Sequence, residues 1–162
     1  MEMESLQDLF VHQLQDLYNA ENQILRALPK MIKKASAREL KAAFQEHLDV
    51  TKQQVERLEL VFESVGEKVK GKTCKAMKGI IEEAKESMEE DAEPEVLDAA
   101  LIADAQRVEH YEIAGYGTVR AYAELLGNSK AAKLLQQTLD EEGEADKKLT
   151  SLAETLINIQ AQ

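Results

Sequence analysis

Three glutamates lie where a helical protein normally has an apolar core residue. Glu112 belongs to VEHYEIAGYG (residues 108–117), in a segment whose apolar residues recur at spacings of three and four. Glu21 and Glu142 interrupt two other segments that have the same period. Several unpaired buried carboxylates are costly and repel one another, so such a group must share protons, pair with basic side chains or bind a divalent cation. The remaining alternative is that the helix face is misassigned and the glutamates are exposed.

The three glutamates belong to rows of core positions that advance by alternating steps of four and three, as in a helical bundle. Four such rows can be drawn, and each is apolar at both ends and polar in the middle. The rows are Phe10, Leu14, Leu17, Glu21, Ile24, Leu28, Met31; Leu40, Phe44, His47, Thr51, Gln54, Leu58, Val61, Val65; Leu101, Ala105, Val108, Glu112, Gly115, Val119, Tyr122, Leu126; and Ala131, Leu135, Thr138, Glu142, Ala145, Leu149, Leu152, Leu156.

The polar interruptions share one level if the rows form two antiparallel hairpins that turn near residues 35 and 128. Glu21 then lies beside Thr51, and Glu112 lies beside Glu142. Helical geometry brings three more candidate ligands within one turn of this layer: His47, Glu109 and Asp146. Supporting hydrogen bonds are expected from Thr51, Gln54 and Tyr18.

Carboxylates with a nearby imidazole suit manganese, iron or zinc, whereas carboxylates alone also suit magnesium or calcium. No basic side chain occupies a core position in these rows, so pairing with Lys or Arg is not expected inside the layer. A metal site and a network of shared protons therefore both remain open.

Five helical segments are expected to position the layer: residues 5–34, 37–65, 74–90, 94–126 and 129–157. Ser5 with Asp8 and Ser36 with Glu39 are capping signals for the first two, and Pro94 suits the first turn of the fourth. The predicted fold class is all-α, a four-helix bundle of two antiparallel hairpins joined by a long crossover that carries a short fifth helix. We expect one domain over residues 1–162.

The bulk composition indicates a soluble cytoplasmic protein. The chain has 162 residues and a formal charge of −11, which argues against nucleic acid or an anionic membrane as partner because both need a basic surface. Its single cysteine excludes an internal disulfide. The N-terminal residues lack the pattern of a signal peptide, and no apolar run reaches the ~20 residues needed to span a bilayer.

Other reactive side chains are assigned to packing or to the surface. Cys74 has no partner of the Cys-x-x-Cys type, so an ordinary packed or half-exposed thiol is expected. Tyr111 and Tyr116 are expected to pack at the edge of the bundle. His110 points away from its core row, which favours a surface position.

The carboxylate pattern resembles the ferritin-like superfamily. More closely, the whole chain is similar to the YciF/YciE-type bacterial stress proteins. This resemblance rests on five segments that follow one another in the same order: DLYNAENQILRALPKM, HLDVTKQQVERLE, CKAMKGIIEEA, DAALIADAQRVEHYEIAGYGT and KAAKLLQQTLDEE.

The resemblance implies a ferritin-like, homodimeric stress protein comparable with rubrerythrin-type di-iron proteins. It makes Glu21, the pair Glu109 and Glu112, and Glu142 the carboxylate ligands, and Asp146 falls where the family often has a histidine. The chain departs from the Glu-x-x-His pattern of di-iron sites at two places, since it has Thr51 with Gln54, and Glu142 with Ala145.

Two functions follow from the sequence. One is a stress protein with a metal site in the bundle core, holding iron or manganese and acting on peroxide or oxygen. The alternative is a structural or partner-binding stress protein whose polar layer sets the register of the helices without metal.

Overall fold

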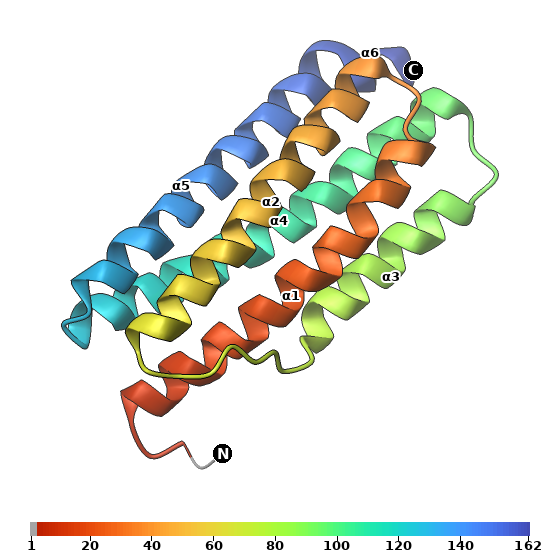
Figure 1. Ribbon diagram of the computed structural model, residues 1–162. Helices are drawn as coiled ribbons and strands as arrows, with labels where there is room; N and C mark the ends of the chain where they lie inside the picture. The colour runs from red at the N-terminus through yellow and green to blue at the C-terminus, as the bar shows by residue number, and fades with distance from the viewer. Residues whose placement is uncertain (1–2) are drawn as a thin grey trace.

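The computed structural model describes residues 3–162, and every regular element over that range is helical (Figure 1). Residues 1 and 2 of the predicted domain lie outside the described range. The elements are α1 (Leu6–Lys34), α2 (Arg38–Ser64), α3 (Lys75–Glu89), α4 (Pro94–Leu125), α5 (Ser129–Leu152), a π-helical turn (Ala153–Ile157) and α6 (Asn158–Gln160).

Four long helices form the bundle, and α3 lies along its side (Figure 1). α1 and α2 form one antiparallel pair, and α4 and α5 form the other. α2 packs against α5 and α1 packs against α4, while α3 contacts both α1 and α4. The predicted all-α four-helix bundle with a fifth helix in its crossover is confirmed. Among the described residues, no helix is both long and apolar enough to cross a bilayer.

Several helix ends follow directly from local sequence. Ser5 caps α1, since its hydroxyl accepts from the Asp8 amide at 3.1 Å and the Asp8 carboxylate accepts from the Ser5 amide at 2.9 Å. Pro94 occupies the first turn of α4. α2 and α4 are each followed by a glycine with positive φ, Gly66 at 72° and Gly127 at 76°, a conformation in which a Cβ would be strained.

The expected cap of α2 is wrong. Ser36 does not cap this helix; Ala37 is its N-cap residue and provides no side-chain hydrogen bond. Instead the buried carboxylate of Asp98, on α4, accepts from the Ser36 amide at 2.8 Å and from the Ala37 amide at 2.7 Å. A carboxylate that takes two backbone donors is a stronger acceptor than one serine hydroxyl, so α4 fixes the start of α2.

Two apolar clusters fill the bundle, as the rows predicted. One contains Phe10, Leu14, Leu17 and their neighbours, and the other contains Leu28, Phe44 and theirs. In α1 the fully buried Glu21 lies between Leu17 of the first cluster and Ile24 of the second. The polar layer therefore has one apolar cluster on each side.

Two of the predicted rows drift from the observed core. In α4 the buried positions after Glu112 are Tyr116, Val119 and Ala123, whereas Leu126 is exposed. A straight helix turns every 3.6 residues, so a strict 3.5-residue row leaves the core after a few turns. At the end of α5 the π-helical turn shifts burial to Ala153 and Ile157.

Candidate metal centre

The central side chains of the four rows are buried together. Glu21, Glu109 and Glu112 are 0% exposed, Glu142 is 1% exposed and His47 is 8% exposed. They come from α1, α2, α4 and α5, so every helix of the bundle contributes. The alternative of a misassigned helix face is thereby excluded, and these five side chains are called the polar layer below.

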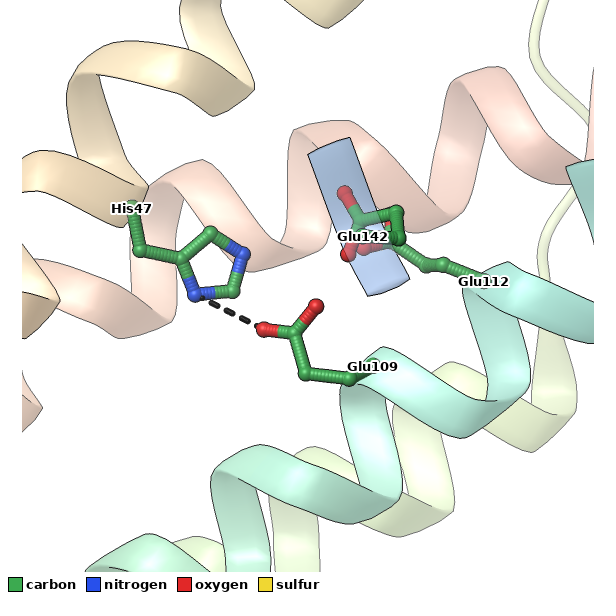
Figure 2. A group of neighbouring side chains, drawn as sticks. All are labelled: His47, Glu109, Glu112 and Glu142. Atoms are coloured by element: carbon green, nitrogen blue, oxygen red, sulfur yellow. Dashed lines mark ion pairs between the residues drawn. The ribbon is translucent and has the colours of Figure 1, made fainter. Parts of the chain in front are cut away.

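Four members of the polar layer are close enough to hold one ion. His47, Glu109, Glu112 and Glu142 each offer a ligand atom, and these atoms all lie within 4.8 Å of one another (Figure 2). Atoms on opposite sides of a bound ion are separated by twice the bond length, which is about 4 to 5 Å for ordinary divalent cations. The group could therefore bind a metal after only small side-chain movements.

The histidine ring is oriented by a neighbouring carboxylate. His47 Nδ1 lies 3.0 Å from Glu109 Oε1, and Figure 2 shows the other ring nitrogen turned toward Glu142. A carboxylate beside one nitrogen of a metal-binding histidine fixes the ring and leaves the second nitrogen as the ligand. The His47 Nε2 atom is the ligand atom that this arrangement favours.

Most polar atoms of the layer have no hydrogen-bond partner. The buried atoms without a hydrogen-bond partner are His47 Nε2, Glu21 Oε2, Glu142 Oε2, Glu109 Oε2 and both carboxylate oxygens of Glu112, while Glu109 Oε1 has only its ion-pair contact with His47. Buried polar atoms in proteins are almost always paired, so this concentration demands an explanation. Two carboxylates that face each other contain only acceptors, and either a shared proton or a cation satisfies them.

One donor that the sequence reasoning missed enters the layer. Tyr116 is completely buried and its hydroxyl donates to Glu21 Oε1 at 2.5 Å. The expectation that Tyr116 packs at the bundle edge is wrong. Its position four residues after Glu112, and so on the same helical face, was the available signal.

The layer retains protons near neutral pH when no metal is bound. Burial raises the pKa of Glu21 to about 7, helped by the charge of Glu142 and opposed by the hydrogen bond from Tyr116. Burial likewise raises the pKa of Glu109 to about 7. Burial and the neighbouring glutamates hold the pKa values of Glu112 and Glu142 well above the usual range. Because the groups interact, their protons belong to the layer as a whole.

Asp146 lies outside the four-residue group. Its Oδ2 atom is 3.1 Å from His110 Nε2, and its Oδ1 atom accepts from Gln106 at 3.2 Å. The His110 side chain is 68% exposed, in line with the surface position expected for it.

The three residues expected to support the layer donate hydrogen bonds to groups other than its side chains. The Thr51 hydroxyl donates to the His47 backbone carbonyl at 2.7 Å. Gln54 Nε2 donates to Glu141 at 3.2 Å, and the Tyr18 hydroxyl donates to Glu59 at 3.1 Å.

A basic side chain is buried in the core, against expectation. Arg57 is 8% exposed and forms a two-pronged contact with Glu141, at 2.8 and 2.9 Å. It also donates to the Thr138 hydroxyl at 2.7 Å. Arg57 falls outside the four rows because it immediately precedes Leu58. Its charge neutralises Glu141, so it does not compensate the negative charges of the polar layer.

Cys74 is a packed thiol, the first of the two environments expected for it. It is completely buried at the start of α3, where its sulfur accepts from the Met77 amide. The sulfur lies 3.0 Å from the Tyr111 hydroxyl, which donates to Asp16. Burial raises the pKa of this thiol, which suppresses the reactive thiolate.

Comparison with known proteins gives consistent relatives over the whole chain. A family described as a domain of unknown function, DUF892, matches residues 5–162. Protein YciF of Escherichia coli K12 is 50% identical over 163 residues, which cover 100% of this chain and 98% of the relative.

Solved structures agree with this relationship. The crystal structure of the E. coli stress protein YciF has a TM-score of 0.93 and 51% identity, covering 96% of this chain and 99% of that one. YcfI from Rhodopseudomonas palustris has a TM-score of 0.90 and 47% identity, covering 92% and 95%. A two-domain Anabaena variabilis protein containing a ferritin-like domain has a TM-score of 0.63 and 21% identity, covering 95% of this chain and 38% of that one. This last likeness concerns the fold alone.

Proposed function

This chain belongs to the DUF892 family, and we propose that its bundle binds a divalent cation between His47, Glu109, Glu112 and Glu142. The observation that carries the proposal is that four buried ligand atoms lie within 4.8 Å of one another. Each of the four side chains has at least one buried polar atom without a hydrogen-bond partner. A cation would neutralise the carboxylates and occupy the position toward which their free oxygens converge.

The donor set favours a transition metal. Three carboxylates and one imidazole suit iron, manganese or zinc better than calcium or magnesium, which prefer oxygen ligands alone. Glu21 is available as a further ligand because its Oε2 atom is unpartnered while Tyr116 holds Oε1. The helix α2 supplies only His47, so this proposal is for one ion in place of the di-iron pair that the family resemblance implies.

Iron or manganese held in this layer would supply redox chemistry toward peroxide or oxygen. The chain's own contribution is to hold the ligands and to exclude water. Tyr116 fixes Glu21, Glu109 lies against His47, and the two apolar clusters close the layer on both sides. The similarity to the E. coli stress protein YciF supports a role in a stress response for this chain, and its cytoplasmic location stays a prediction.

A non-catalytic structural role is the second candidate, and a specific observation favours it. The raised pKa values of the four glutamates allow them to share protons, and the Tyr116 hydroxyl already bonds one of them. In that case the polar layer sets the register of the four helices without metal, in the way that buried polar residues fix register in coiled coils.

Metal retention distinguishes the two candidates. The protein would be loaded anaerobically with Fe(II), Mn(II) or Zn(II), desalted and assayed by elemental mass spectrometry beside Glu112→Gln. Glu124→Gln is the matched control, because Glu124 is an exposed glutamate on the same helix as Glu112 and lies outside the polar layer. One equivalent in the wild type and in the control, lost in Glu112→Gln, is expected. No retained metal in any of the three would reject the metal site in favour of the structural role.

The homodimer implied by the family resemblance remains a prediction. Light scattering at several protein concentrations tests it, and a mass near that of one 18.1 kDa chain would contradict it.

A further inference from the structure

The polar layer has two approaches from the surface, and both reach His47. One is a cavity of about 180 Å³ between α2 and α5. The other is a cavity of about 230 Å³ that involves α1, α3 and α4. An ion bound in the layer must arrive through some such opening, since the layer itself is closed by two apolar clusters.

We propose that a divalent cation reaches the polar layer through the α2–α5 cavity and that the Lys148–Glu46 ion pair restricts this passage. The proposal rests on the metal site proposed above. Two members of the layer, Glu142 and His47, line the α2–α5 cavity. Of the layer residues, the other cavity contacts only His47. Glu142 and His47 each carry a buried atom without a partner, and both are more than nine-tenths buried.

The charges around the two cavities also favour entry through the α2–α5 cavity. Exposed carboxylates of Glu46 and Glu144 line the α2–α5 cavity. The other cavity is edged by three exposed basic side chains, Arg26, Lys30 and Lys85. Its one carboxylate, Asp104, is buried and lies 3.0 Å from the Arg107 guanidinium, so the lining remains net positive. A cleft lined by charges opposite to those of a ligand raises its local concentration and its rate of association, and a cleft lined by like charges lowers both. The cation is therefore drawn to the α2–α5 side.

The positive charge of Lys148, which also lines the α2–α5 cavity, opposes the attraction of a cation. Its ammonium group forms an ion pair with Glu46 that joins α5 to α2, and both side chains are more than half exposed. The pair occupies one of the two exposed carboxylates and places a positive charge in the path of the ion. Breaking the pair frees Glu46 and removes that charge.

Two charge reversals give a matched test. Lys148→Glu and Lys85→Glu change the net charge by the same amount, and each removes one exposed ion pair, with Glu46 or with Glu89. They differ in which cavity becomes more negative. Metal-free wild type and both variants would be mixed with Co(II) in a stopped-flow instrument, and the absorbance of the bound ion would be followed at low and high salt.

We expect Lys148→Glu to raise the association rate constant about three- to tenfold at low salt, with a smaller gain at high salt where exposed charges are screened. Lys85→Glu should change it less than twofold, and all three proteins should bind the same number of ions at equilibrium. An equal or larger acceleration by Lys85→Glu, or no change with Lys148→Glu, would overturn the route while leaving the site intact. Failure of the wild type to take up Co(II) at all would reject the metal site, and the route with it.

Discussion

The Tyr116 hydroxyl on α4 donates a 2.5 Å hydrogen bond to the Glu21 carboxylate on α1, and both side chains are completely buried. This contact joins the two hairpins at the level of the polar layer. It lowers the pKa of Glu21, although burial outweighs it and the net shift is upward. Tyr116 therefore contributes, after burial and the neighbouring glutamates, to how easily Glu21 gives up its proton.

Replacing Tyr116 with Phe should destabilise the metal-free protein by about 1–3 kcal/mol at pH 8, because a buried carboxylate loses its donor. The loss should be smaller at pH 5, where Glu21 carries its own proton. Urea unfolding followed by circular dichroism at the two pH values measures both effects. Tyr122→Phe, at a half-buried position of the same helix, is the control and should stay within about 0.5 kcal/mol of wild type.

The metal-free protein should be more stable at pH 5 than at pH 8. The folded-state pKa values of Glu21 and Glu109, about 7, exceed the ordinary value of 4.5. Between these values the folded state binds more protons than the unfolded state, so the free energy of unfolding falls as pH rises through about 7. Chemical denaturation across pH 5–8 in the presence of a chelator should record a loss on the order of a few kcal/mol.

Glu112→Gln provides the check on this assignment, since it removes one titrating group and one source of repulsion from the layer. Its stability should depend less steeply on pH than that of the wild type. Saturating metal should have the opposite effect, because deprotonated carboxylates bind cations more tightly and binding stabilises the folded state. A chelated wild type whose stability rises from pH 5 to pH 8 would contradict the buried, protonated layer.

Asp98→Ala should destabilise the protein by about 1–3 kcal/mol, because the Ser36 and Ala37 amides at the start of α2 lose their acceptor. Asp98→Asn retains one acceptor oxygen and should lie between alanine and wild type. Thermal unfolding of the three proteins at pH 7 tests the order. If alanine and asparagine were equally harmless, the α4 carboxylate would not be what fixes the start of α2.

Gly115 and Gly143 should respond to alanine in opposite directions. A Cβ at Gly115 would lie 2.7 Å from Leu17 Cδ2, a side chain packed in the core, whereas a Cβ at Gly143 would meet nothing within 4 Å. Gly143→Ala should therefore gain up to about 1 kcal/mol of helix propensity. Gly115→Ala should lose about 1–3 kcal/mol through overpacking between α1 and α4. Denaturant midpoints measure both, and a gain in both variants would contradict the close approach of the two helices.

The sequence was sufficient for the bundle and for its central layer. A carboxylate in an apolar row is visible without a structure, and the same interruption in four rows placed Glu21, Glu112 and Glu142 at one level. The helical spacing of apolar residues and the position of a hairpin turn are local properties, so both can be predicted from a single sequence.

The details that failed depend on contacts between helices. That the Tyr116 side chain fills the core beside Gly115 depends on the accumulated turn of α4, which a 3.5-residue row does not follow. The cap provided by Asp98 joins residues about sixty positions apart, and the pairing of Arg57 with Glu141 joins residues still further apart. Such pairs form because helix packing brings distant residues together, so they cannot be predicted from a local sequence pattern.

The most direct test of the metal site is the anomalous diffraction of crystals grown from the protein loaded with Mn(II). The account predicts one strong anomalous peak in the polar layer, within about 2.0–2.6 Å of ligand atoms from His47, Glu109, Glu112 and Glu142. Peaks confined to surface carboxylates, with an ordered layer and no peak inside it, would contradict a metal site and leave shared protons as the occupant of the bundle core.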